Sequence, residues 1–279
     1  MDTKRAFYEG YKHEFEVQME INMIEEKSKK TKLRAIMSSL IFSVVLMIFP
    51  VASGVIVVVN DLDVIQSYWL QGAFMMLSIA VPAIFMWITK IKPAEIGFAG
   101  MEKGSVKTVL YFAPVIAAKT GFLFYGINHD IHTIMALAFF TIAIGLSEVL
   151  YFRGIILSKL STCFTIKQTV ILSSVFFAAV HASQAFSGAG IFMVALAIIN
   201  ALLFGIVASE IVMLTKSIIS VIIWHMLYDF INWIALIQGT TEIIFITIQS
   251  VIMIIYAIYL WTRLPRTHLV RGVSRVGKA

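Results

Sequence analysis

Eight apolar stretches dominate this sequence, and each is long enough to form a helix that crosses a lipid bilayer. A bilayer core about 30 Å thick requires roughly 20 apolar residues of helix. The stretches cover residues 35–59, 64–89, 108–127, 133–158, 168–186, 190–214, 217–237 and 242–262. Hydrophobic residues make up 59% of the 279 residues and charged residues only 14%, whereas soluble domains carry roughly 25% charged residues. We therefore predict an all-α, polytopic membrane protein, a bundle of eight transmembrane helices.

The basic residues predict the orientation of this bundle. If the N-terminus is cytoplasmic, eight spans place both termini and the loops 90–107, 159–167 and 215–216 in the cytoplasm. These segments hold nearly all of the Lys and Arg residues, whereas the four opposite loops contain acidic residues and no Lys or Arg. The positive-inside rule predicts this asymmetry. We expect a multi-pass protein with both termini cytoplasmic, in a cell membrane of bacterial type.

The chain is expected to divide into three segments around this bundle. Residues 1–33 are polar with mixed charge and predict a cytoplasmic N-terminal segment, folded as a solvated or interfacial helix. Residues 34–263 form the transmembrane domain, and residues 264–279 form a basic cytoplasmic tail that contacts anionic lipid headgroups. The net charge of +6 forms no continuous patch, so a nucleic-acid partner is not expected.

A few ionisable residues lie inside the predicted spans, where each costs roughly 2.5–3.5 kcal/mol on insertion scales. They are Lys119, Glu148, Arg153, His181, His225 and Asp229. A single polar residue of this kind can simply hold two helices together. A glutamate, two histidines and an aspartate on three neighbouring helices instead indicate a buried functional site. Asn200 and Glu210 could line the same cavity.

The spacing of these residues indicates which side chains share a helix face. His225, Asp229 and Asn232 are separated by four and three residues, so they lie on one face of a helix. An aspartate in this position can fix the tautomer of the histidine. Glu148 and Arg153 are five residues apart, about 140° around an α-helix, so we expect Arg153 to pair elsewhere or to cap the helix. Lys119 is expected to be a structural ion-pair partner of Glu148 or Asp229.

Three short motifs resemble those of a known family. Residues 147–154 (SEVLYFRG) resemble the EExxxRG motif of the CPBP intramembrane proteases, the family of type II CAAX prenyl proteases and bacteriocin-processing and immunity proteins. Residues 177–181 (FAAVH) match the family motif FxxxH, and residues 225–229 (HMLYD) match HxxxN/D. The motifs occur in the family order on the fourth, fifth and seventh predicted spans, and the resemblance covers roughly residues 93–235.

The resemblance implies an intramembrane endopeptidase that hydrolyses a peptide bond in a membrane-associated protein or peptide, with the catalytic residues Glu148, His181, His225 and Asp229. Glu148 and His181 would activate water, and His225, oriented by Asp229, would stabilise the oxyanion. Arg153 and Asn232 would be structural or substrate-binding. We expect cleavage from the cytoplasmic side. For some members, the resemblance implies immunity against bacteriocins.

Two departures and one competing mechanism leave alternatives open. Val149 replaces the second glutamate of the first motif, and Asp229 stands where many members carry Asn. Two histidines and a glutamate are also the ligand set of several zinc hydrolases, so Glu148, His181 and His225 could bind Zn, although we favour a site without a cofactor. The main rival is a catalytically inactive family member that acts as a membrane scaffold or regulator. A transporter with a proton relay is a weaker rival, because no repeat symmetry is visible.

Overall fold

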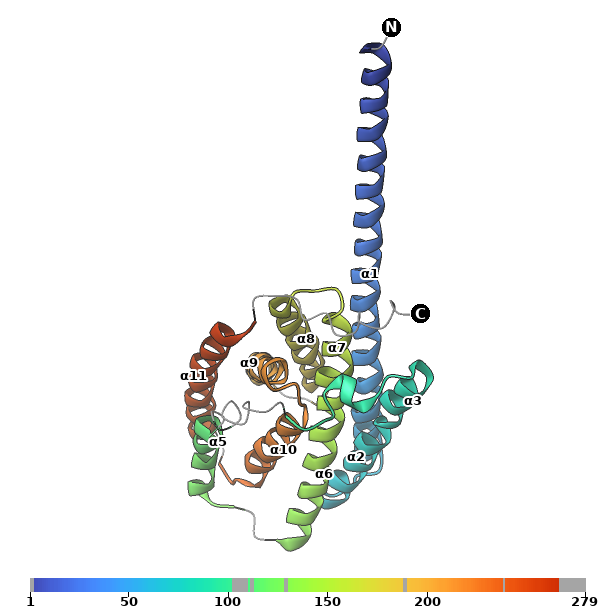
Figure 1. The fold of residues 1–279 in the computed structure, drawn as a ribbon. Coiled ribbons are helices and arrows are strands. Elements are labelled where there is room, and N and C mark those ends of the chain that lie inside the picture. Colours follow the sequence, from blue (N-terminus) through green and yellow to red (C-terminus); the bar gives the residue numbers. More distant parts are fainter. Residues whose placement is uncertain are drawn as a thin grey trace.

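The computed structural model describes residues 3–101, 110, 113–127, 130–187, 190–237 and 239–265, and these residues are almost entirely helical (Figure 1). The first half contains α1 (Thr3–Val59), α2 (Val64–Ser78), α3 (Ala80–Thr89), η1 (Pro93–Ile96), α5 (Ala113–Thr120) and η2 (Gly121–Tyr125). The second half contains α6 (Ile131–Val149), η3 (Leu150–Ile156), α7 (Leu157–Leu160), α8 (Ile166–Val180), η4 (His181–Ser187), α9 (Ile191–Thr215), α10 (Ile219–Ile234) and α11 (Gly239–Arg263). The prediction of an all-α, polytopic membrane protein is confirmed.

Helices of membrane-spanning length occupy six of the eight predicted spans. Six described helical segments are long and apolar enough to cross a bilayer. Two shorter apolar helices, Val115–Tyr125 and Ile219–Ile234, lie within the third and seventh predicted spans. Part of the third span, including residues 108 and 109, lies outside the described residues. The count of eight crossings and the cytoplasmic position of the termini stay predictions.

Polar residues just before the helices set where several of them begin. Asp63 accepts a hydrogen bond from the backbone N–H of Gln66 at 2.8 Å, and the Gln66 side chain accepts one from the backbone N–H of Asp63. Thr165 and Gln168 form the same reciprocal arrangement at the start of α8. Such capping boxes satisfy backbone donors that have no partner in the first helical turn. Each of these two helices therefore starts at the edge of an apolar stretch.

The bundle is built around α6, which packs against α2 on one side and α10 on the other. The pairs α8–α9 and α9–α11 complete the bundle, and α1 contacts α2, α8 and η3. The N-terminal part of α1 continues the same helix beyond the bundle (Figure 1). The predicted N-terminal segment is thus helical and continuous with the first span. Its described side chains, at positions 18–20 and 22–34, are exposed.

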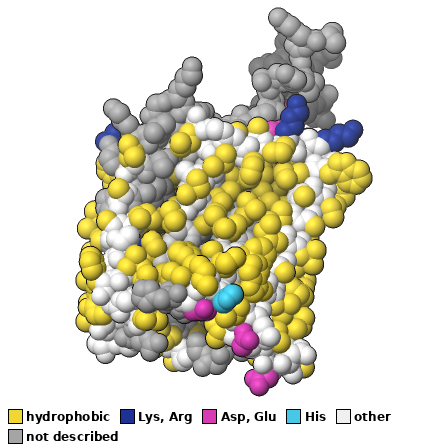
Figure 2. Space-filling view, turned by 90° about the horizontal axis from the view of Figure 1, so that it is seen from below, with side chains coloured by type: hydrophobic (Ala, Val, Ile, Leu, Met, Phe, Trp, Pro, Cys, Tyr) yellow, Lys and Arg dark blue, Asp and Glu magenta, His cyan; other side chains and the backbone are white. Residues whose placement is uncertain are grey.

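The surface of the bundle is mostly apolar. Hydrophobic side chains cover most of the face shown in Figure 2, with Lys and Arg at its upper edge and most of the visible acidic side chains toward its lower edge. Large hydrophobic residues such as Trp87 and Ile191 are 81% and 90% exposed. Such a contiguous apolar surface would promote aggregation in water. It is the surface that lipid tails require.

Gly145 allows α6 and α10 to approach closely, and we predict that a larger side chain here destabilises the bundle. A Cβ atom at Gly145 would lie 3.0 Å from the backbone nitrogen of Met226 and 3.3 Å from the carbonyl oxygen of Ile222. Gly145→Val should lower stability by about 1–3 kcal/mol, measured by thermal unfolding in detergent. Gly54→Val in α1 is the matched control, because a Cβ there meets nothing within 4 Å. Equal stability of the two variants would contradict close packing of α6 on α10.

Candidate active site

The residues of all three motifs line one cavity of about 550 Å³ inside the bundle. It lies among α1, α2, α5, α6, α8, α9, α10 and α11, together with η4. Much of its wall is apolar, including Leu46, Phe177 and Phe204. Its ionisable and amide side chains include Lys119, Glu148, His181, His225, Asp229 and Asn232. The sequence prediction that the catalytic candidates face a common polar cavity agrees with this placement.

His225 lies between two carboxyl groups. Its Nε2 atom is 3.6 Å from Oε2 of Glu148 and 3.5 Å from Oδ2 of Asp229. The side chains of His225, Glu148 and Asp229 are 6%, 16% and 19% exposed, so they are shielded by the bundle while still reachable from the cavity. The pairing of His225 with Asp229 one turn later is the arrangement that the sequence spacing predicted.

His181 is held by the last turn of α8. Its Nδ1 atom is 2.9 Å from the carbonyl oxygen of Phe177, one turn earlier. A carbonyl oxygen can only accept, so Nδ1 carries the proton and Nε2 presents a lone pair. The Phe177 ring packs edge-on against the rings of both His181 and His225, with centroids 4.7 and 6.0 Å away. Phe177 therefore contacts both imidazoles, and Phe204 packs against His225 as well, with ring centroids 4.6 Å apart.

The helix that carries Glu148 changes geometry directly after it. Residues Leu150–Ile156 form a π-helical segment, in which hydrogen bonds join residues five apart and which is often found at functional sites. The angle of about 140° between Glu148 and Arg153 assumes an α-helix throughout, whereas the residues from Leu150 onward are π-helical. Residues five apart lie closer to one face here.

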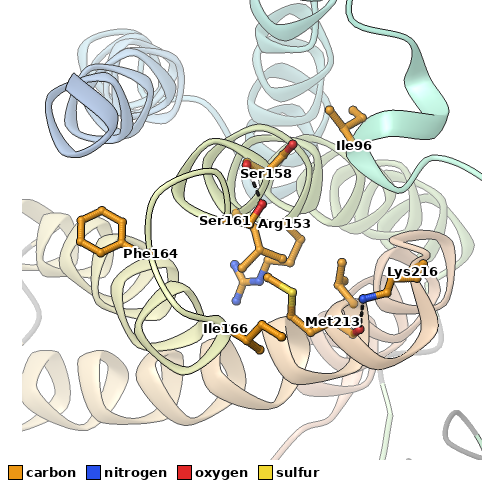
Figure 3. Close-up of a pocket in the computed structure, with 10 residues that line it drawn as sticks. Ile96, Arg153, Ser158, Ser161, Phe164, Ile166, Met213 and Lys216 are labelled. Atoms are coloured by element: carbon orange, nitrogen blue, oxygen red, sulfur yellow. Dashed lines mark hydrogen bonds between the residues drawn. The ribbon is translucent and has the colours of Figure 1, made fainter. Parts of the chain in front are cut away.

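Arg153 makes its main contact with an aromatic ring. Its guanidinium carbon lies 4.1 Å from the centroid of the Phe177 ring, and its Nε and Nη2 atoms are buried without a hydrogen-bond partner. Figure 3 shows the side chain in a second, smaller pocket among residues that include Ile166 and Met213. Arg153 thus braces Phe177, the residue between the two histidines, from the side opposite the main cavity.

Lys119 joins the site from α5, a helix outside the three motifs. Its Nζ donates a hydrogen bond of 2.5 Å to Oδ1 of Asn232 and lies 4.0 and 4.4 Å from the ring centroids of Phe122 and Tyr228. Lys119 is only 1% exposed. Lys119 interacts electrostatically with the carboxyl groups of Asp229 and Glu242. The electrostatic partner of Asp229 is Lys119. The lysine therefore lies at the Asp229 end of the site rather than at Glu148.

The described donor atoms form no ready-made metal site. Among the described residues, no group of three or more His, Cys, Asp or Glu side chains could hold an ion. Nδ1 of His181 bonds a backbone carbonyl, which leaves Nε2 free, as in many metal-binding histidines. Zinc binding by Glu148, His181 and His225 stays a prediction.

Of the two further polar residues that could line the cavity, Asn200 does so and Glu210 does not. Asn200 lines the cavity and accepts a hydrogen bond from the Tyr228 hydroxyl at 3.4 Å, and the Gln249 side chain donates to the same hydroxyl. Glu210 is fully buried in α9 away from the cavity wall. The sequence does not identify Tyr228 and Gln249 as site residues, because a single tyrosine or glutamine within an apolar span carries no distinctive signal.

An all-α bundle with a buried cavity of ionisable groups defines a polytopic membrane protein with an intramembrane site. Residues 130–231 match the family of type II CAAX prenyl endopeptidase Rce1-like proteins. The match covers 102 of the 279 residues and includes all three motifs. Comparisons with curated proteins and with solved structures found no significant match. The family resemblance seen in the motifs is confirmed, and it supports an intramembrane protease type of function.

The position of Lys119 predicts an energetic coupling to Asp229. Lys119→Met should leave the carboxylate of Asp229 buried without its counter-charge and destabilise the protein by about 3 kcal/mol. Asp229→Asn removes that carboxylate, so the double variant should lose much less than the sum of the two single variants. Thermal unfolding of the four proteins in detergent measures this coupling. Strict additivity would mean that the two charges do not interact.

Proposed function

We propose that the protein is an intramembrane endopeptidase that hydrolyses a peptide bond in a membrane-associated protein or peptide. The observation that carries this proposal is the placement of His225 Nε2 within 3.6 Å of Glu148 and 3.5 Å of Asp229, in the cavity that His181 also lines. A bilayer-buried protein keeps such charges only where they are used or neutralised. The family match over residues 130–231 gives the same class of reaction.

Water activation is assigned to Glu148 and His181. The lone pair on Nε2 of His181 and the carboxylate of Glu148 are both hydrogen-bond acceptors. A water molecule has two protons to donate, so it can bond both groups while its own lone pair faces the substrate carbonyl carbon. Glu148, held in an apolar cavity, then takes a proton from the attacking water as general base.

Oxyanion stabilisation is assigned to His225. Its Nε2 faces two carboxyl groups, which favours the tautomer with the proton on Nε2. That N–H can donate to the oxygen of the tetrahedral intermediate, where charge develops. Asp229 acts through His225 by orienting the ring. Lys119 in turn offsets the charge of Asp229.

The reaction balances with these groups alone. The oxygen of the water forms a bond to the carbonyl carbon, and its proton moves to Glu148. When the intermediate collapses, the carbon–nitrogen bond breaks and Glu148 returns the proton to the leaving amine. The second proton of the water stays on the new carboxyl group, so the products are a carboxylic acid and an amine, which become a carboxylate and an ammonium group when that proton passes to the amine. Glu148 regains its starting state.

Val149 does not argue for an inactive scaffold. Its side chain is 1% exposed and belongs to the hydrophobic core rather than to the wall of the cavity. A carboxylate at this position would therefore face the core of the bundle. The replacement by valine leaves the polar groups of the cavity unchanged, which supports the enzyme over the scaffold.

Removal of the proposed base is expected to abolish cleavage. Glu148→Gln keeps the shape of the side chain and should lower cleavage of a membrane-peptide library by roughly 10²–10⁴-fold, measured with purified protein in detergent. Glu210→Gln is the matched control, because Glu210 is also a buried glutamate but lies away from the cavity. Full activity of Glu148→Gln would refute the proposed base, and equal partner binding by all variants without any cleavage would support the scaffold.

Metal removal is expected to leave activity intact. The purified protein should contain no stoichiometric zinc, and dialysis against a chelator should not change the rate of cleavage, since the described donors form no three-ligand group. Metal content is measured by mass spectrometry alongside the activity assay. One zinc per chain that disappears in His181→Ala would instead establish a metalloprotease.

A further inference from the structure

Arg153 is a buried cation whose hydrogen-bond donors lack acceptors. Its side chain is only 1% exposed. The guanidinium carbon lies 4.1 Å from the centroid of the Phe177 ring, and such a ring attracts a cation through its face. The Nε and Nη2 atoms are buried and donate no hydrogen bond to a described residue. A buried charged donor without an acceptor is costly, so this group requires an acceptor.

Glu148 does not provide that acceptor. It is the carboxyl group that interacts electrostatically with Arg153. However, Glu148 lines the main cavity, where its Oε2 atom lies 3.6 Å from Nε2 of His225. Arg153 instead lines the smaller pocket of Figure 3. The carboxylate and the unpaired donors therefore belong to two different spaces.

The smaller pocket has room for one small ion. Its volume is about 30 Å³, which corresponds to roughly two water molecules. Figure 3 shows the guanidinium of Arg153 pointing into the space between Ser161, Ile166 and Met213. The Ser161 hydroxyl donates to the carbonyl oxygen of Ser158 at 2.7 Å, and Ser158 adds a second hydroxyl to the wall. The pocket thus combines donors with a volume that excludes large organic ions.

The charge of the wall favours an anion. Lys216 also lines the pocket, and its Nζ donates a hydrogen bond of 2.7 Å to the carbonyl oxygen of Met213 (Figure 3). None of the described residues in the wall is acidic. Two cations around a small, largely buried space attract a negative ion more strongly than a neutral water molecule.

We propose that this pocket binds one inorganic anion of the size of chloride, between the guanidinium of Arg153 and the ammonium of Lys216. The inference does not depend on the proposed protease function. With one monovalent anion bound, the two cations retain a net positive charge. Arg153 also acts electrostatically on Glu148 and on both histidines. The anion therefore holds in place the cation that contacts Phe177 and influences the site from behind.

Replacement of one salt by another tests anion binding without any need for activity. The purified full-length protein is unfolded by heat in detergent, with sodium chloride exchanged for sodium gluconate at constant ionic strength. Chloride should raise the unfolding temperature by about 2–4 °C in a saturable manner, because a ligand that binds only the folded state stabilises it. Gluconate is too large for a pocket of about 30 Å³. Equal unfolding temperatures in the two salts would overturn the inference.

A carboxylate attached to the wall tests the location of the site. Ser161→Asp places a negative charge in the pocket and should abolish the response to chloride. Thr162→Asp is the matched control, because the neighbouring Thr162 is exposed and does not line the pocket. This control adds the same charge and should respond as the wild type does. A full chloride response in Ser161→Asp would mean that the ion binds elsewhere.

The line width of the ³⁵Cl nuclear magnetic resonance signal measures binding directly and decides the question if Ser161→Asp does not fold. Lys216→Gln should weaken chloride binding at least fivefold, because it removes one of the two cations. Lys167→Gln removes the same charge from an exposed position outside the pocket and should bind chloride like the wild type. Equal binding by both variants would contradict the assignment of the ion to this pocket.

Discussion

The site depends on one constraint, the mutual neutralisation of ionisable groups where bulk water is absent. Glu148, His225, Asp229 and Lys119 come from α6, α10 and α5, and each compensates a neighbour. A buried charge without such a partner is strongly unfavourable. Gly145 lets α6 approach α10 closely enough for the first of these contacts. The close packing of α6 on α10 therefore also sets the distance between Glu148 and His225.

Much of this arrangement can be predicted from the sequence, because a bilayer restricts a spanning chain to apolar helices of a set length. Apolar length located the helices to within a few residues, and i, i+4 spacing placed His225 with Asp229 on one face. The π-helical segment after Glu148 could not be predicted, since it depends on how η3 packs against α1, α7 and α8. The shape of the cavity is likewise a property of packing between helices and has no signature in any one of them.

Lys119 illustrates a residue whose importance is visible only in three dimensions. It lies outside the matched region 130–231 and in no motif, so the sequence indicated only a partner for one of two carboxylates. The structure places it on the Tyr228 ring beside Asn232, at the Asp229 end of α10. This position accounts for an aspartate where many family members carry an asparagine, because a lysine supplies the charge that the neutral amide does not need.

A hydrolase within a bilayer must admit water without opening a path for ions. Residues 150–157, which follow Glu148 almost directly, are all buried. Arg153 lies among them with its guanidinium against Phe177, and a fixed positive charge there opposes the passage of cations and protons. The helix that presents Glu148 to the cavity therefore continues at once into a buried segment that carries this charge.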